Sequence, residues 1–380
     1  MRCPFCVVIN RAGDCLCAHT ALAFAVLSYA LFNNPTTRMT ISSRHQADDS
    51  RGTQMNILHV CPANCATGGP EAIHWLVSGL NKIEGVNARI WYWDVKSDPP
   101  MPEEYKTYGC EYVTDLPEGY DGAIIYPEIW ANHALDHPEC TNAVWWLGLD
   151  AYAGWTPEQE RGAFLKDDSI IHIVQSEYAN DLLNQLGVKN IVKCTDIVNN
   201  EFYADYEEEE RSDVVLYNPA KATPFMHKLM AECSGIEFKP IRGMTRAEVI
   251  DAMRHAKLYV DFGEFPGRER MPREAALCGC CIITSKIGSA AYDGDFRHPF
   301  KFESKESHLW AIRECIRRVL SDYDNMRTHW DPLRQQLRSD ATEIPKQLQE
   351  VVNAIQYYHP GIQRGEPHPQ CLGFRKGPDV

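Results

Sequence analysis

Three arginines and a glutamate stand close together between residues 262 and 285, where the sequence reads FGEFPGRERMPREAALCGCCIITS. Arg268, Arg270 and Arg273 carry guanidinium groups, which are rigid donors suited to phosphate oxygens. Glu274 follows directly, and its carboxylate can accept two hydroxyl hydrogen bonds from a sugar diol. These residues predict a site for a nucleotide or a nucleotide sugar. They also fit a plainer interpretation, in which Glu274 only begins a helix and the arginines form a solvated surface.

A strand and a helix are expected on either side of this loop. Residues 258–262, LYVDF, form a short apolar run typical of a buried strand. Pro272 fits the first turn of a helix, where its missing N–H breaks no hydrogen bond, and Glu274 is expected in that same turn. The loop would then end at a helix N-terminus, where free N–H groups and the positive end of the helix dipole favour an anion.

Residues 274–279, EAALCG, resemble the second half of the donor-site signature of the retaining GT-B glycosyltransferases of family four, the glycosyl transferases group 1. That signature is a Glu, seven residues, and then Glu-Ala-x-Ala-Cys-Gly-x-Pro. The run matches it except at Leu277, which replaces the second Ala. The resemblance implies that Glu274 holds the ribose hydroxyls of the donor nucleotide.

The first half of the signature differs in this chain. Pro266 stands where the family has its first Glu, and the nearest acids, Glu264 and Glu269, are out of register. The run PGRERMPRE, residues 266–274, is similar to a less studied branch of the family. The usual carboxylate contact to the donor sugar is therefore not predicted at that position.

The resemblance also implies roles for residues far from this loop. Gly68 and Gly69 lie in a GGPE turn between a predicted strand and helix, and similar turns in the family face the donor diphosphate or the acceptor. Lys221 follows a predicted strand at the place where family members carry a cation for the diphosphate. The alternatives are an ordinary tight turn for the glycines and a surface position for the lysine.

Three further residues complete the predicted site. Residues 216–220 hold none of the arginines that the family places there, so Arg268 is expected to supply the second cation for the diphosphate. Arg270 is expected to contact the donor nucleotide. Asp150 stands where the family commonly has a His near the reacting sugar, and its alternative is a helix cap or a loop acid.

Other acids and aromatic residues are candidates for the acceptor side. Glu128 ends an apolar run, at the strand end where open α/β sheets bind ligands. Trp130 and Trp155 are predicted in loops, where an indole ring can stack on a sugar.

The charge distribution favours a small anionic ligand. The chain has 380 residues, 44% of them hydrophobic, and a formal net charge of −14. An acidic chain argues against nucleic acid as the main partner, because nucleic acids reward a basic surface. Residues 239–273 nevertheless hold eight Lys/Arg and five Asp/Glu, a local charge of +3.

Alternating strand and helix patterns from Met55 onward predict an α/β protein with two Rossmann-like domains facing a cleft, the GT-B architecture. The acidic run at residues 205–213 reads as a junction between them. The expected divisions are a non-core extension, an acceptor domain, a nucleotide-sugar donor domain, and a C-terminal helix with a disordered tail, at residues 1–54, 55–204, 205–330 and 331–380.

The first 54 residues are expected to be dispensable, with Met55 opening the first core strand. Their apolar stretch, residues 18–32, is short for a membrane span, which needs about 20 residues, so no stable span is expected. A small zinc site at Cys3, Cys6, Cys15 and Cys17 is the alternative left open there. The thiols are expected to be reduced, as in a cytoplasmic protein.

The prediction for the whole chain is a glycosyltransferase of hexosyltransferase type. The resemblance implies transfer with retention, without a metal or a cofactor, from a nucleotide sugar to a glycan, lipid or small-molecule acceptor. A nucleotide-sugar epimerase or hydrolase on the same fold is one alternative. A catalytically degenerate nucleotide-binding scaffold is the other, because the first family Glu and one cation are absent.

Overall fold

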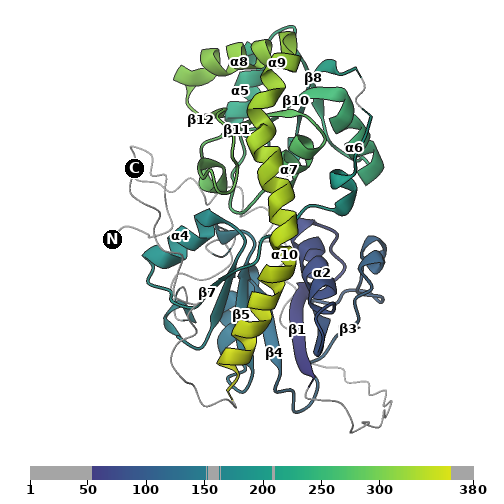
Figure 1. Ribbon diagram of the computed structural model, residues 1–380, viewed down its shortest axis with the longest axis vertical. Coiled ribbons are helices and arrows are strands. Elements are labelled where there is room, and N and C mark those ends of the chain that lie inside the picture. Colours follow the sequence, from purple (N-terminus) through teal and green to yellow (C-terminus); the bar gives the residue numbers. More distant parts are fainter. Residues whose placement is uncertain (1–53, 151, 153–161, 163, 208–209, 361–380) are drawn as a thin grey trace.

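The computed structural model describes residues 54–150, 152, 162, 164–207 and 210–360. Two parallel sheets divide this part of the chain, one above the other in Figure 1. We call the part built on the first sheet the N-terminal domain and the part built on the second the C-terminal domain.

The N-terminal domain contains a seven-stranded parallel sheet in the order β3-β2-β1-β4-β5-β6-β7. Ile57 in β1 lies opposite Ala88 of β2 on one side and Ala123 of β4 on the other. The strands and α-helices are β1 (Met55–Pro62), α2 (Gly68–Leu80), β2 (Val86–Trp93), β3 (Tyr112–Val113), β4 (Ala123–Pro127), β5 (Thr141–Trp146), β6 (Ile171–Val174), α4 (Glu177–Gln185) and β7 (Ile191–Lys193).

Apolar side chains cover both faces of this sheet, which is why its inner strands read as continuous hydrophobic runs. Every residue of β5 is buried. One core lies on the face covered by α2, and a second lies on the opposite face around Trp146 and Leu183. Short 3₁₀ helices connect the strands at η1 (Glu103–Tyr108), η2 (Glu128–Leu135), η3 (Phe164–Lys166) and η4 (Asn200–Tyr203).

The C-terminal domain contains a five-stranded parallel sheet in the order β12-β11-β10-β8-β9. Its strands are β8 (Ser212–Tyr217), β9 (Glu237–Pro240), β10 (Ala256–Asp261), β11 (Cys281–Ser285) and β12 (Lys301–Phe302). Its helices are η5 (Pro219–Lys221), α5 (Pro224–Glu232), α6 (Arg246–His255), α7 (Arg270–Leu277), η6 (Gly288–Ala291), η7 (Glu306–His308), α8 (Leu309–Ser321), α9 (Tyr323–Met326) and η8 (Arg327–Trp330).

One long helix, α10 (Asp331–Tyr358), joins the two domains and runs beside both sheets in Figure 1. Its first part packs Leu333 and Leu337 into the core of the C-terminal domain. Its second part packs Leu348 and Val351 into the N-terminal domain against α2. A Cβ atom on Gly79 of α2 would lie 2.8 Å from a methyl carbon of Leu348, so the missing side chain lets the two helices approach closely.

The packed domains leave few cysteines in contact with solvent. Ten cysteines lie in the described part of the chain, and all of them are free thiols. Cys278, Cys280 and Cys281 are buried, as their apolar surroundings in the sequence predict. None of the described helices combines the length and the apolar character that crossing a bilayer requires.

Candidate functional site

The loop from Phe262 to Glu269 connects β10 to α7 and lies against the N-terminal domain. The backbone N–H of Leu149 donates to the carbonyl of Pro266 at 2.9 Å, a hydrogen bond between the two domains. A Cβ atom on Gly267 would lie 1.8 Å from the carbonyl oxygen of Leu147. Only glycine therefore permits the loop to pack this closely, and the glycine of the PGRERMPRE run is explained by the interface.

Helix α7 begins earlier than the sequence predicts. Its first residue is Arg270, so Pro272 does lie in the first turn. Glu274 is the fifth residue and belongs to the second turn, which corrects the expectation that it opens the helix. Proline can occupy any position of the first turn without the loss of an intrahelical hydrogen bond, so Pro272 does not mark the first residue of the helix. The helix therefore begins two residues before it, at Arg270.

Glu274 is half-buried, and charged side chains lie around its carboxylate. No residue in the described part of the chain donates a hydrogen bond to it. Burial raises the pKa of Glu274, Arg270 and Arg273 oppose that shift, and Glu71 and Asp196 add to it. Its carboxylate oxygens are free to accept hydroxyl groups from a ligand.

Each arginine of the loop meets a carboxylate from a distant part of the sequence. Arg268 donates to Asp340 of α10 at 2.6 Å, Arg270 to Glu71 of α2 at 2.7 Å, and Arg273 to Asp196 after β7 at 2.9 Å. We call these three pairs the interdomain arginine pairs. They disagree with the interpretation of the arginines as a solvated surface, because the exposed fractions of the three side chains are 2%, 16% and 1%.

Arg268 is therefore placed differently from the expectation that it faces a donor diphosphate. Its guanidinium is buried between Asp340 and Asp295, which lies 3.8 Å from Nε. Burial lowers the pKa of Arg268, and the two carboxylates more than offset that effect. Asp295 also accepts the backbone N–H groups of Glu177 and Tyr178 at the start of α4. In this arrangement Arg268 fixes the position of the loop.

The glycine-rich turn of the N-terminal domain lies beside the start of α7. Helix α2 begins at Gly68, and a Cβ atom there would be 3.3 Å from Cδ of Arg270. A Cβ atom on Gly69 would meet no described atom within 4 Å. The structure thus brings Gly68, Gly69 and Arg270 together, with Glu274 one turn further along α7.

Glu71, in the first turn of α2, links the two domains at this point. Its carboxylate accepts hydrogen bonds from Arg270, from Arg246 at 2.7 Å and from the hydroxyl of Tyr108 at 2.9 Å. Burial alone would raise the pKa of Glu71, but these partners together lower it. The sequence singled out the turn that contains Glu71 and gave it no role, because Arg246 and Arg270 lie far away in the chain.

Lys221 ends η5, directly after β8, and its ammonium group donates to the carboxylate of Glu269. A Cβ atom on Gly263 would lie 3.2 Å from Cβ of Lys221, so the loop passes close to this lysine. Asp261 completes the group. It accepts the N–H of Gly263 at 2.9 Å and the hydroxyl of Tyr259 at 3.1 Å, and burial raises its pKa to about 6.

Asp150 faces Glu264 of the C-terminal loop. The hydroxyl of Tyr178 donates to its carboxylate at 3.2 Å. Asp150 is exposed, but partial burial of its carboxylate raises its pKa. The hydrogen bond from Tyr178 opposes this shift, and the negative charge of Glu264 adds to it. Glu264 is exposed and is a second acid that the family register did not select. Its only sequence signal is its place two residues before Pro266.

Glu128 is a buried acid that contacts the end of β5. The residue is 8% exposed, and its carboxylate accepts the backbone N–H of Leu147 at 3.3 Å. Burial raises the pKa of Glu128 to about 7. Trp130 is half-buried, with its ring 5.1 Å from that of Trp93. Trp155 lies outside the described residues.

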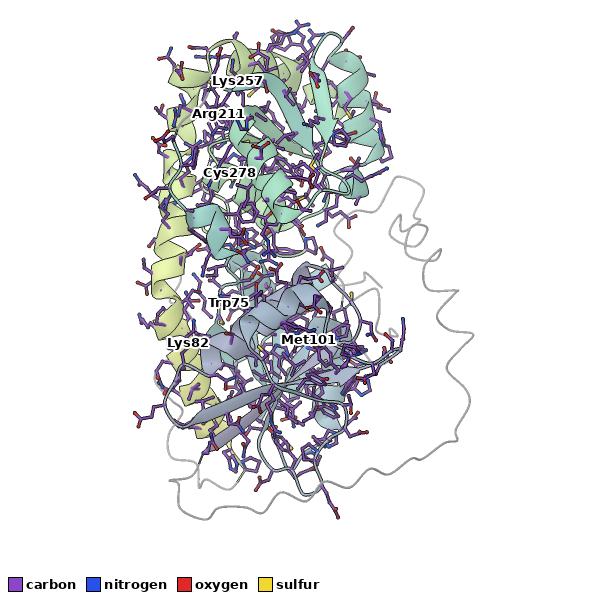
Figure 2. All side chains as sticks on the ribbon, turned by 90° about the vertical axis from the view of Figure 1, so that its right-hand side faces the viewer. Trp75, Lys82, Met101, Arg211, Lys257 and Cys278 are labelled. Atoms are coloured by element: carbon purple, nitrogen blue, oxygen red, sulfur yellow. The ribbon has the colours of Figure 1, made fainter. Side chains whose placement is uncertain are left out.

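Metal ligands are not grouped in the described part of the chain, where no cluster of three His, Cys, Asp or Glu side chains could hold an ion. Cys3, Cys6, Cys15 and Cys17 lie outside that part. Figure 2 shows side chains from both domains meeting at the level of Trp75 in α2, below the residues labelled in the C-terminal domain.

Comparison with known proteins gives structural matches only. No protein-family model and no curated protein matches the sequence. A glycosyltransferase from Rickettsia africae has a TM-score of 0.59 at 11% identity, covering 82% of this chain and 100% of its own. HepE from Anabaena, in complex with UDP and glucose, has a TM-score of 0.58 at 13% identity, covering 79% and 100%.

Sucrose-phosphate synthase from Thermosynechococcus elongatus is similar in the same way, with a TM-score of 0.59 at 13% identity over 80% of this chain and 99% of its own. Each match covers 79–82% of this chain, which is more than either domain contains, so each extends over both domains. The chain has the GT-B fold, with two Rossmann-like domains.

Proposed function

We propose that this chain is a glycosyltransferase that transfers a sugar from a nucleotide-sugar donor to an acceptor hydroxyl. The observation that carries the proposal is the carboxylate of Glu274, half-buried and without a hydrogen bond from the described residues, beside Arg270 and the Gly68–Gly69 turn. The GT-B fold supports it, because HepE with this fold has UDP and glucose bound.

The proposed roles follow from the chemistry of the side chains. Glu274 accepts the two ribose hydroxyls, and the open backbone at Gly69 allows the diphosphate to approach α2. Lys221 and Arg270 stabilise the charge that develops on the departing diphosphate, the step at which positioned cations lower a barrier most. Arg268 does not contact the donor and instead fixes the loop through its pair with Asp340.

In the transfer, the bond between the anomeric carbon and the diphosphate oxygen breaks and a bond to the acceptor oxygen forms. The proton of the acceptor hydroxyl passes to the departing diphosphate oxygen, and the nucleoside diphosphate leaves. We propose retention of configuration and no metal, with residues 55–204 holding the acceptor and residues 205–330 the donor. Asp150 and Glu264, one from each domain, are the acids nearest to a reacting sugar in this scheme.

The test is release of nucleoside diphosphate from a panel of UDP-, GDP- and ADP-sugars, measured with and without a mixture of candidate acceptors. Release that requires an acceptor, with a glycosylated product by mass spectrometry, is the expected result. Release without an acceptor would identify a hydrolase, and a changed sugar on intact donor would identify an epimerase. Binding without either reaction would identify a scaffold.

A further inference from the structure

We propose that Glu269 is a built-in competitor of the donor, a carboxylate that occupies Lys221 until a diphosphate displaces it. This inference rests on the proposed function, because it concerns the same nucleotide site. It assigns a role to an acid that lies inside the PGRERMPRE run and that neither the family signature nor the proposed chemistry uses.

The geometry of Glu269 is unusual for its place in the chain. It stands at the N-cap of α7, where the shorter side chains of Asp, Asn, Ser or Thr would accept a helix N–H. Among the described residues, its side chain accepts no such bond, and it reaches to Lys221 of η5 instead. Strands β8 and β10 are neighbours in the sheet, and the chain after each strand leads to one of these two residues, to η5 after β8 and to the N-cap of α7 after β10. An acid therefore sits between a lysine and a helix end, the two features that would attract a phosphate.

The Lys221–Glu269 pair is also the one that solvent reaches most easily. Lys221 is 37% exposed and Glu269 is 18% exposed. The guanidinium groups of Arg268 and Arg273 are almost fully buried, and Arg270 is held by a carboxylate of the other domain. Exchanging a partner at Lys221 breaks no contact between the domains, whereas exchange at any of the interdomain arginine pairs does.

The energies favour exchange at this lysine. A diphosphate carries at least two negative charges where the carboxylate of Glu269 carries one, so it attracts the ammonium group of Lys221 more strongly. A diphosphate that reaches Lys221 therefore gains more than it displaces. Asp261 stays beside Lys221 in both states, since its hydrogen bonds to Gly263 and Tyr259 do not involve Glu269. Glu269 then selects for ligands with enough negative charge to displace it.

The experiment measures binding of UDP, GDP and ADP by calorimetry to the full chain and to Glu269→Gln, which keeps the shape and removes the charge. The variant is expected to bind its preferred nucleoside diphosphate about two- to fivefold more tightly and the matching nucleoside equally well. The affinity of the variant for the diphosphate is also expected to fall more steeply with salt, because the charge of Lys221 is then unpaired before the ligand binds. Unchanged or weaker diphosphate binding overturns the inference.

Two comparisons separate competition from other effects. Glu306→Gln removes the acid of the exposed Lys228–Glu306 pair and is the matched control, so equal tightening there would show a general charge effect and overturn the inference. In a Lys221→Ala background, Glu269→Gln is expected to have little effect, since the contested partner is gone. If the native chain binds a nucleoside diphosphate and Glu269→Gln changes nothing, only this inference fails. If neither protein binds any of them, the proposed function fails with it.

Discussion

At the scale of single residues, the site is a set of charges in which Glu274 differs from the rest. Glu71, Asp196 and Glu269 each hold an arginine or lysine, whereas Glu274 accepts no hydrogen bond from the described residues. The EAALCG run predicts Glu274 as a site residue. The pairing of the other acids could not be predicted, because periodicity and spacing describe neighbours in sequence and Glu71 meets Arg270 across the fold.

Replacement of Glu274 by Gln is expected to weaken nucleotide binding by about 1–3 kcal/mol, because one charged acceptor for the ribose is lost. The fold is expected to survive, since no described hydrogen bond depends on the carboxylate. A 2′-deoxy nucleotide should bind the native chain poorly and lose little more in the variant. Calorimetry of both ligands with both proteins forms a double-mutant cycle, and fully additive losses would contradict a ribose contact.

Glu128 is expected to make stability depend on pH. Burial raises its pKa from 4.5 to about 7, so the folded state binds the proton more tightly than the unfolded state. Its stabilising contribution is fully present below about pH 4.5 and is lost as pH rises through about 7. The difference between the two pKa values corresponds to a change of about 3 kcal/mol in the free energy of unfolding across this pH range.

Glu128→Gln is expected to remove this slope and to raise the melting temperature relative to the native chain at pH 8 more than at pH 5. Thermal unfolding across that range is the measurement. Glu118→Gln, at an exposed glutamate of the same domain, serves as the control and should leave the slope as it is. Equal behaviour of both variants would contradict the assignment.

At the scale of elements, local signals in the sequence located the helices and strands that position the site. Thr245 and Glu248 make both hydrogen bonds of a capping box at the start of α6, and Ser176 accepts the N–H of Ala179 at the start of α4, two caps that can be read from the sequence. The start of α7 was predicted less well, because proline fits several positions of a first turn. The 3₁₀ helix that places Lys221 has three residues, which is too short for a periodic pattern.

Substitution by alanine is expected to lower stability at Gly267 and to leave it nearly unchanged at Gly69. At Gly267 the new methyl group would lie 1.8 Å from the carbonyl of Leu147 and 2.7 Å from Nε2 of Gln175, so the loop must move. Gly267→Ala is expected to lower the free energy of unfolding by about 1–3 kcal/mol. Chemical denaturation measures this, and a neutral substitution would show that the interface is looser than described.

Gly69→Ala is expected to leave stability within about 0.5 kcal/mol, because the methyl group meets no described atom within 4 Å. If the diphosphate approaches the backbone there, binding of the nucleoside diphosphate should weaken while binding of the nucleoside changes little. Parallel denaturation and calorimetry separate the two effects. Unchanged diphosphate binding would place the ligand away from this turn.

At the scale of the whole molecule, the two domains are joined by the interdomain arginine pairs and by α10. The two-domain GT-B fold could be predicted, because the strand and helix alternation appears twice. The way the domains are fixed to each other could not, since it depends on partners such as Arg268 and Asp340 that are 72 residues apart in the sequence and meet only in the folded chain. All three predicted cations, Lys221, Arg268 and Arg270, have acids as partners.

Asp340→Asn is expected to destabilise the protein by about 3 kcal/mol, because it leaves the buried guanidinium of Arg268 with only the more distant Asp295. Asp331→Asn is the matched control on the same helix. Asp331 is 55% exposed and pairs with Arg334, so its loss should cost less than about 1 kcal/mol. Comparable losses in the two variants would show that the Arg268 pair contributes no more than a surface pair.

Helix α10 contains a proline at the place where it passes from one domain to the other. Leu337 is the last of its side chains in the core of the C-terminal domain, Ile344 is the first in the core of the N-terminal domain, and Pro345 follows. Proline has no N–H to donate to the carbonyl of Ala341, one turn earlier, so α10 bends most easily at this position. A swing of one domain against the other therefore meets least bending resistance at this point, while each half of the helix moves rigidly with the core that holds it.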